Sequence, residues 1–438
     1  MRSCLNRREF LGRSAAFGGV LAAGWHVNPS SVAESTSSNE KLNIAAVGTM
    51  NRAGANISGT SSENIVALCD VDENLLGTAA MKHPAARKYR DFRVMLEKEA
   101  DKIDAVLVGT PDHCHASAAA MAMRLGKHVY CEKPLTHTVY EARTLAELAK
   151  SNNLITQMGT QIHAGDNYRR VVELIQTGAI GKVSEVHVWV GVNYGGSRFT
   201  TNTPAPKHLD WDLWLGPAPQ RPYSKGVHPG RWRRFWDYGT GGLGDFGCHY
   251  MDLVHWALKL RHPTTVEAEG PELHPDATPA WLIVKYQHPS RGELPPVKLT
   301  WYDGGRRPDL LSRLRGKDGK PINWGSGQLF VGEAGILLSN YSQHVLLPTD
   351  KFADIDRPEP FIPKSIGHHQ EWIQAIKNGG ATTCNFDYSG ALTEAVLLGN
   401  VSYRSGKSIE WDAKNLKVTN APEAQQFVHK EYRKGWTL

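Results

Sequence analysis

Two residues in the second half of the chain have the types and spacing of an acid–base pair. Asp245 and His249 follow the glycine-rich segment 241–244 and begin a stretch whose apolar periodicity predicts a helix. Residues four apart lie on one helix face, so the carboxylate is expected to orient the imidazole and favour its charged form. The position of His249 at the start of a helix favours the neutral form, because the helix dipole opposes positive charge there. An imidazole can accept the proton of an alcohol near neutral pH. The alternative is a helix-capping aspartate beside a structural histidine.

The first half of the chain has the element order of a dinucleotide-binding unit. A β-type run ends at Gly48, a helix is expected next, and a second apolar strand, residues 65–69, ends at Asp70. The Asp70 carboxylate would accept hydrogen bonds from ribose hydroxyls and repel a 2′-phosphate, which favours NAD over NADP. From these residues alone, a strand–helix–strand turn without a nucleotide stays open as an alternative.

The glycine fingerprint after the first strand is incomplete. Only the first of its three glycines is present, and Met50 stands where the backbone should approach the pyrophosphate. Arg52 is expected to compensate with charge-assisted hydrogen bonds to phosphate. The cofactor contacts expected in this turn are Gly48, Thr49, Met50, Asn51 and Arg52.

Polar residues also follow the later strands of this half, 103–109, 128–131 and 154–158. Ligands of such sheets bind outside the carboxyl ends of the strands, so these residues are expected to face the cofactor. The polar residues are Thr110, His113, His115, Glu132, Lys133 and Gln161, and Pro111, next to Thr110, is expected to contact the cofactor as well. No metal site is predicted, because the two histidines lack a third ligand at a suitable spacing.

These and other motifs of the chain resemble the Gfo/Idh/MocA family, the relatives of glucose–fructose oxidoreductase and inositol dehydrogenase. The resemblance covers about residues 41–412. It is carried by Thr110-Pro111-Asp112-x-x-His115 and by the segments 126–134, 178–183, 211–217 and 241–249. It implies NAD(P), a sugar, polyol or related substrate, and subunits that often form dimers or tetramers. It also implies that Lys133 lies beside the nicotinamide, positioned by a bond before Pro134 that is often cis.

The fold class is predicted to be α/β with two domains. Residues 41–160 are expected to form a Rossmann domain with a doubly wound parallel sheet. Residues 161–412 are expected to form an α+β substrate and oligomerisation domain with an open, mainly antiparallel sheet, because strand-like runs follow one another without crossover helices. Helices at 368–377 and 389–404 are expected to return toward the first domain, and residues 413–438 form a C-terminal tail.

A long loop, residues 202–240, is rich in tryptophan, proline and arginine, and loops of this length are usually functional. Its tryptophans could stack on sugar faces or pack the loop onto the core; they are Trp211, Trp214, Trp232 and Trp236. The substrate contacts expected overall are Lys133, Tyr168, Trp236, Asp245 and His249.

The N-terminus has the pattern of a twin-arginine export signal. Arg7 and Arg8 precede a short apolar run, residues 14–24, and small residues stand before position 34. We therefore expect a signal peptide at residues 1–33, a polar linker at 34–40, the Tat machinery as a partner and a periplasmic location. The alternative is a basic N-terminal arm.

The composition excludes several other classes. The 438 residues are 41% hydrophobic and 21% charged, as in globular domains. The formal charge is +6; four arginines and one glutamate in residues 1–33 supply +3, and the remaining +3 gives no support for nucleic-acid binding. No apolar stretch of about 18 residues predicts a spanning helix. Five cysteines beyond the signal, without C-x-x-C spacing, predict neither a disulfide framework nor a zinc site.

The sequence thus predicts hydride transfer from a substrate carbon to NAD, with His249 or Lys133 accepting the hydroxyl proton and Asp245 orienting His249 or the sugar. An exported enzyme would do best with a tightly held cofactor that it recycles internally. Two alternatives stay open: a glycosidase or lyase that oxidises its substrate transiently, and a non-catalytic sugar-binding protein of the cell envelope.

Overall fold

The computed structural model describes residues 40–200, 203–355 and 357–438. Residues Lys41–Leu438 form one compact unit, separate from Met1–Glu40. The predicted signal peptide, residues 1–33, and residues 34–39 of the predicted linker lie outside the described residues. Among the helices that the structure describes, none combines the length and the apolar character needed to cross a membrane.

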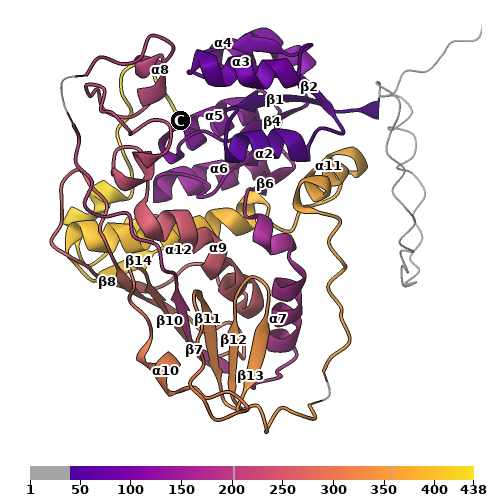
Figure 1. Cartoon of the computed structure of the whole chain (residues 1–438), viewed down its shortest axis with the longest axis vertical. Coiled ribbons are helices and arrows are strands. Elements are labelled where there is room, and N and C mark those ends of the chain that lie inside the picture. Colours follow the sequence, from indigo (N-terminus) through magenta and orange to yellow (C-terminus); the bar gives the residue numbers. More distant parts are fainter. Residues whose placement is uncertain (1–39, 201–202, 356) are drawn as a thin grey trace, which may run out of the picture. The chain divides into compact units, whose positions relative to one another are not determined.

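A six-stranded parallel sheet forms the N-terminal part of the compact unit (Figure 1). Its strand order is β3-β2-β1-β4-β5-β6, a doubly wound order that reverses between β1 and β4. The strands are β1 (Asn43–Val47), β2 (Asn64–Cys69), β3 (Arg87–Tyr89), β4 (Ala105–Val108), β5 (His128–Cys131) and β6 (Thr156–Met158). The main helices between them are α2 (Arg52–Gly59), α3 (Glu73–Lys82), α4 (Phe92–Glu99), α5 (Asp112–Arg124) and α6 (Val139–Ser151). The predicted Rossmann sheet is confirmed.

Side-chain caps explain where two of these helices begin. Asp72 accepts hydrogen bonds from the backbone N–H groups of Asn74 and Leu75 at the start of α3. Thr138 begins α6 with a capping box, in which Glu141 bonds back to the Thr138 N–H. Both caps satisfy N–H groups that the first turn of a helix leaves without partners.

A nine-stranded sheet forms the C-terminal part, in the order β13-β12-β11-β7-β10-β9-β8-β14-β15. It is mainly antiparallel, as predicted, but β7 and β10 pair in parallel, so the sheet is mixed. Its strands are β7 (Val183–Trp189), β8 (Thr265–Glu269), β9 (Ile283–His288), β10 (Val297–Tyr302), β11 (Gly327–Gly332), β12 (Ile336–Ser339), β13 (His344–Leu347), β14 (Ile409–Asp412) and β15 (Lys417–Val418). The helices of this part are α7 (Asp166–Gln176), α8 (Trp211–Leu215), α9 (Gly241–Leu258), α10 (Asp309–Arg313), α11 (His368–Asn378) and α12 (Phe386–Ser405).

Two long helices, α9 and α12, lie between the two sheets (Figure 1). The α12 helix packs against both α6 of the Rossmann sheet and α9. Across the first contact, the Arg143 guanidinium makes two hydrogen bonds, of 2.8 and 2.9 Å, to the Glu394 carboxylate, which is almost fully buried. The two domains therefore share one core rather than meeting as separate bodies.

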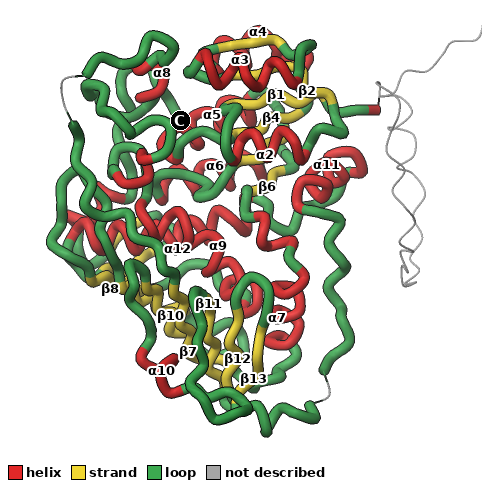
Figure 2. The backbone as a smooth tube through the Cα atoms, viewed as in Figure 1, coloured by secondary structure: helices red, strands yellow, loops and turns green. Residues whose placement is uncertain are grey.

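The tryptophan-rich loop is drawn mostly as irregular chain in Figure 2. Its described part carries α8 and one short 3₁₀ turn, Arg231–Arg234. Its apolar side chains form a cluster of their own, which contains Leu209, Trp214, Leu215, Ala218, Val227, Trp232, Phe235 and Tyr238. Packing thus accounts for most of the aromatic content of the loop.

Candidate active site

A cleft of about 500 Å³ lies at the carboxyl ends of β1, β2, β4 and β5. Phe246 and two predicted site residues of α9 close it from the second domain. The predicted residues that line this cleft are Gly48, Thr49, Met50, Asn51, Arg52, Asp70, Thr110, Pro111, His115, Glu132, Lys133, Asp245 and His249. Residues separated by up to about 200 positions in the sequence therefore meet in one cavity.

The turn after β1 is tightly packed. Gly48 has a φ of 87°, and a Cβ there would lie 2.8 Å from the carbonyl oxygen of Gly109. A Cβ on Gly109 would lie 2.6 Å from the Cβ of Ala53, which stands at the third position of the glycine fingerprint. Met50 is 39% exposed, so its side chain does not fill the turn. With Gly48 at the first position of the fingerprint and Ala53 at the third, strand and helix approach each other as closely as in a dinucleotide site.

Asp70 stands at the end of β2 with its carboxylate in the cleft. Its Oδ2 accepts hydrogen bonds from the N–H and the hydroxyl of Thr49, at 3.0 and 2.8 Å. Burial raises the pKa of Asp70, and these hydrogen bonds oppose the rise. The first turn of α2 contains no acidic residue, so its N–H groups are free of competing charge. An acceptor at the ribose position and an open helix N-terminus fit an adenine dinucleotide.

Lys133 and Asp245 form a buried ion pair across the domain boundary. The Lys133 Nζ lies 2.5 Å from Asp245 Oδ1 and also donates to the Asp245 carbonyl at 2.8 Å. The side chains are 12% and 8% exposed. The Lys133–Pro134 peptide bond is cis, as the resemblance implied. The ammonium is therefore held at one point of the cleft.

The Asp245 carboxylate has further partners that the sequence did not predict. Arg233 donates from Nε to Oδ1 at 3.1 Å, and the Tyr194 hydroxyl donates to Oδ2 at 2.6 Å. Burial alone would raise the pKa of Asp245, but the charges of Lys133 and Arg233 hold it well below its usual range. The structure differs here from the prediction that Asp245 orients His249, because these partners occupy both carboxylate oxygens.

His249 lies on the same face of α9 as Asp245, one turn further on. Its Nδ1 is buried without a hydrogen-bond partner among the described residues, which leaves Nε2 as the nitrogen that reaches the cleft. Burial and the Lys133 charge lower the pKa of His249 well below its usual value. Asp245 favours the charged imidazole, as predicted, but burial outweighs this effect, so the net shift is toward the neutral form.

Asp112 is a second carboxyl group of the cleft, noted in the sequence only as part of a motif. It is 2% exposed, and its Oδ2 accepts a hydrogen bond of 2.8 Å from the Thr240 hydroxyl. Burial raises the pKa of Asp112 to about 7, and the Arg233 charge opposes the rise. The pKa values of Asp112 and Asp245 are thus shifted in opposite directions, although both carboxyl groups line the same cleft.

Four predicted contact residues lie outside the cleft lining. The His113 ring lies between the carbonyl oxygens of Trp214 and Tyr238, at 3.0 and 3.3 Å. Gln161 donates to the Tyr130 hydroxyl and to Glu132, and Tyr168 donates to the His249 carbonyl at 3.1 Å. Trp236 lines a different cavity. Gln161 and Tyr168 contact cleft residues from behind, so they are positioning residues in this structure.

Several aromatic residues of the cleft were not predicted from the sequence, among them Tyr341 and Trp436. Trp436 comes from the predicted C-terminal tail and packs against Phe92, with the Arg93 guanidinium 4.1 Å from its ring centroid. Tyr341 stacks on Tyr250 with ring centroids 4.5 Å apart. Neither residue belongs to a motif, and only the tertiary fold places them at the cleft.

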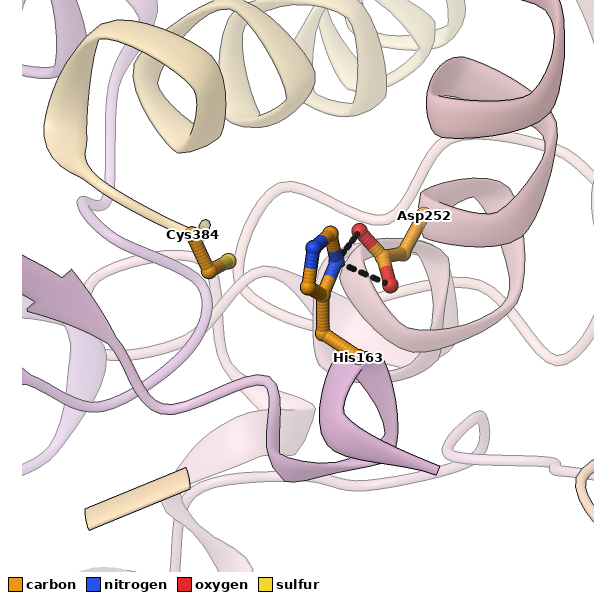
Figure 3. A group of neighbouring side chains, drawn as sticks. All are labelled: His163, Asp252 and Cys384. Carbon is orange, nitrogen blue, oxygen red and sulfur yellow. Dashed lines mark hydrogen bonds and ion pairs between the residues drawn. The ribbon is translucent and has the colours of Figure 1, made fainter. Parts of the chain in front are cut away.

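Outside the cleft lining, His163, Asp252 and Cys384 form a buried group (Figure 3). The His163 Nδ1 lies 2.9 and 3.0 Å from the two Asp252 oxygens, and the Tyr388 hydroxyl donates to Asp252 Oδ1 at 2.7 Å. His163 also stacks on Trp256. Because the carboxylate is already bonded, the group is better explained as a link between α9 and the neighbouring elements than as a metal site.

Comparison with known proteins identifies the family. The NAD-binding Rossmann fold of the Gfo/Idh/MocA oxidoreductase family matches residues 42–160, and the C-terminal alpha/beta domain of that family matches residues 169–293. Myo-inositol 2-dehydrogenase of Thermotoga maritima is 26% identical over 170 residues, 39% of this chain and 46% of that protein. Levoglucosan dehydrogenase of Pseudarthrobacter phenanthrenivorans is 26% identical over 198 residues, 44% of this chain and 42% of that protein. The chain thus spans less than half the length of these relatives.

Solved structures share the fold at low sequence identity. The WlbA dehydrogenase from Bordetella pertussis, in complex with NADH and UDP-GlcNAcA, has a TM-score of 0.59 and 16% identity over 85% of this chain and 99% of its own. The aldose-aldose oxidoreductase from Caulobacter crescentus, complexed with glycerol, has a TM-score of 0.54 and 16% identity over 85% of this chain and 100% of its own. The chain belongs to the Gfo/Idh/MocA oxidoreductase family, and its first domain is the NAD-binding Rossmann fold of that family.

Proposed function

We propose that the protein is an NAD-dependent oxidoreductase that acts on a hydroxyl group of a sugar, a polyol or a related carbohydrate. The observation that carries this proposal is the single cleft in which the NAD-site residues Gly48 and Asp70 lie together with Lys133, Asp245 and His249. The named sugar and inositol dehydrogenases among its relatives support it. Bound NAD would supply a hydride acceptor.

The residues of the chain divide the remaining tasks. Arg52 and the N-terminus of α2 would bind the pyrophosphate, and Asp70 the ribose. His249 is neutral because its pKa is lowered, so its Nε2 can accept the substrate hydroxyl proton. The Lys133 ammonium would stabilise negative charge on the substrate oxygen. Asp245 acts by holding that ammonium in place, and Arg233 and Tyr194 hold Asp245.

The test is a substrate screen on the purified protein. Sugars and polyols are added one at a time with NAD, NADH absorbance is followed, and bound nucleotide is extracted and weighed by mass spectrometry before and after each addition. Substrate-dependent reduction of free or bound NAD supports the proposal. A protein that binds no nucleotide and changes no carbohydrate would contradict it.

A second candidate is a glycosidase or lyase that oxidises its substrate transiently and returns the hydride. The specific observation in its favour is a glycosyl hydrolase family 109 protein of Saccharopolyspora erythraea, 27% identical over 239 residues, 50% of this chain and 46% of that protein. Release of the aglycone from an aryl glycoside without net NADH would select this candidate. Net NADH formation would select the dehydrogenase.

We also propose that the protein is exported through the twin-arginine pathway. We propose further that it keeps its cofactor tightly bound and recycles it internally, and that its subunits form dimers or tetramers. The Arg7–Arg8 pair and the apolar run after it support export. Replacing both arginines with lysine should keep the protein in the cytoplasm. Nucleotide that survives gel filtration would support the tightly bound cofactor. A light-scattering mass two or four times the subunit mass found for the same sample by mass spectrometry would support dimers or tetramers.

A further inference from the structure

A second cavity, of about 620 Å³, lies apart from the cofactor cleft. It is formed by the last turns of α12, the segment 236–240 and the C-terminal segment 425–431. Its volume falls within the roughly 300–1,000 Å³ of small-molecule sites. Its apolar wall consists of Val139, Ala218, Pro219, Leu397, Val401 and Phe427.

The Arg404 guanidinium of this cavity has no carboxylate within 4 Å among the described residues, although the charge of Asp237 acts on it from further away. It lies 5.1 Å from the ring centroid of Trp236 and 4.4 Å from that of Phe427. Stacking on rings leaves the in-plane N–H groups of a guanidinium available. In the described part of the chain these groups meet no hydrogen-bond acceptor. Burial lowers the pKa of Arg404 to about 10, which still leaves it charged near neutral pH.

The other charges near the cavity are already neutralised, apart from Glu431 at its exposed rim. The Lys430 ammonium has three acceptors, the His113 carbonyl, the His137 ring and the Glu141 carboxylate, at 3.2, 3.1 and 3.1 Å. Asp237 pairs with Arg221. Arg404 is therefore the least compensated positive charge of the inner cavity, since Asp237, the carboxylate that acts on it, already pairs with Arg221.

A buried acceptor lies one helical turn before Arg404. Asn400 is 7% exposed and lines the cavity. Its Nδ2 donates to the Thr240 carbonyl at 2.9 Å, which fixes the orientation of the amide, because a carbonyl can only accept. Its Oδ1 is buried without a partner. A buried acceptor left unpaired costs free energy that a ligand hydroxyl would recover.

We propose that this second cavity binds a small polyhydroxy carboxylate, such as a sugar acid. The carboxylate would pair with the fork of Arg404 N–H groups, and a hydroxyl group would donate to Asn400 Oδ1. A phosphate dianion fits less well, because its second negative charge meets no second free cation among the described residues of the cavity and is repelled by Glu431 at the rim. The proposal does not depend on the reaction in the cofactor cleft.

The test is isothermal titration of the full-length protein, with its cofactor, using sodium gluconate, glucose and inorganic phosphate as probes. The titrations are repeated with the Lys133→Met variant, so that binding in the cofactor cleft can be distinguished from binding in the second cavity. We expect gluconate to bind equally to the parent and to Lys133→Met, and glucose and phosphate to bind much more weakly. Arg404→Met should weaken gluconate binding roughly tenfold or more, the loss expected for a charge-assisted hydrogen-bonded pair.

A matched control is Arg306→Met, because Arg306 also covers a tryptophan, Trp281, but lies outside the cavity. It should leave gluconate binding unchanged. If Arg404→Met does not fold, 5-fluorotryptophan labelling of the parent gives the answer, since gluconate should shift the fluorine resonance of Trp236. Three outcomes overturn the proposal. Gluconate does not bind, phosphate binds as tightly as gluconate, or gluconate binds but its affinity is unchanged in Arg404→Met and the fluorine resonance of Trp236 does not shift.

Discussion

At the scale of single residues, the Lys133 ammonium is the group on which the proposed chemistry depends most. It is held by Asp245 in a buried pair, and Arg233 and Tyr194 remain on the carboxylate when the lysine is removed. Lys133→Met should therefore fold and bind NAD, while turnover falls by about a hundredfold or more.

The measurement is turnover together with NAD affinity from fluorescence titration. Lys377→Met is a suitable control, because Lys377 also pairs with a buried carboxylate, Glu63, at 2.7 Å but outside the cleft. It should lower stability and leave turnover unchanged. Normal turnover in Lys133→Met would refute the assigned role.

Asp70 sets the expected preference for NAD over NADP. Asp70→Asn removes the negative charge that repels a 2′-phosphate but keeps a side chain that can bond Thr49. The ratio of kcat/KM for NAD to that for NADP should fall about tenfold or more, which corresponds to about 1.4 kcal/mol. The ratio is measured with both cofactors under identical conditions. An unchanged ratio would place the discrimination elsewhere.

The residue types of the site could be predicted from short motifs, but their partners could not. Lys133, Asp245 and His249 stand in recognisable segments, and the structure brings all three to the cleft. Arg233 and Tyr194 come from irregular chain, whose path depends on tertiary packing rather than on local pattern. The charge state of His249 could not be settled from the sequence, because burial, which sequence spacing does not show, outweighs the nearby carboxylate.

At the scale of elements, the turn between β1 and α2 determines whether the cofactor can approach the sheet. Gly48→Ala should reduce both stability and NAD affinity, because the added Cβ combines a positive φ with a 2.8 Å contact to the Gly109 backbone. Gly126→Ala is the matched control: its φ is 75°, but nothing lies within 4 Å of the added Cβ.

Gly126→Ala should lower the free energy of unfolding only by the backbone strain, about 1–2 kcal/mol, and should leave NAD affinity unchanged. Gly48→Ala should cost more, by a further ~1–3 kcal/mol for the steric overlap. Urea unfolding and NAD titration measure both quantities. Equal costs in the two variants would show that the turn relaxes around the extra atom.

Element types were largely predictable, whereas strand pairing was not. The apolar runs of the Rossmann half and the strand at residues 297–301 lie where their patterns placed them. The parallel pairing of β7 with β10 joins segments more than 100 residues apart, so no local signal marks it. The tryptophans of the long loop gave an ambiguous pattern, since stacking on a sugar and packing in a cluster need the same side chains.

At the scale of the whole molecule, buried neutral histidines link stability to pH. Both ring nitrogens of His288 are buried, and burial lowers its pKa to about 3. The folded state therefore binds this proton less readily than the unfolded state, whose histidine has its ordinary pKa near 6.5. The stability contribution is fully present above pH ~6.5 and is lost as the pH falls toward about 3.

Replacing His288 with phenylalanine should remove this contribution to the pH dependence. Between pH 6 and 4, the slope of unfolding free energy against pH should decrease by about 1.4 kcal/mol per pH unit, the value for one proton. Denaturant unfolding at several pH values gives the slope for both proteins. Parallel curves would mean that His288 does not titrate on unfolding in this range.

The position of α12 has a consequence for attempts to engineer the protein. Its Glu394 carboxylate is almost fully buried against Arg143 of α6. Cutting the chain after residue 160 would strip α6 of this partner and expose apolar surface that α12 now covers. Transfer of the Rossmann domain to another protein would therefore require residues 386–405 as well. Chimaeras that contain the domain without this helix should aggregate.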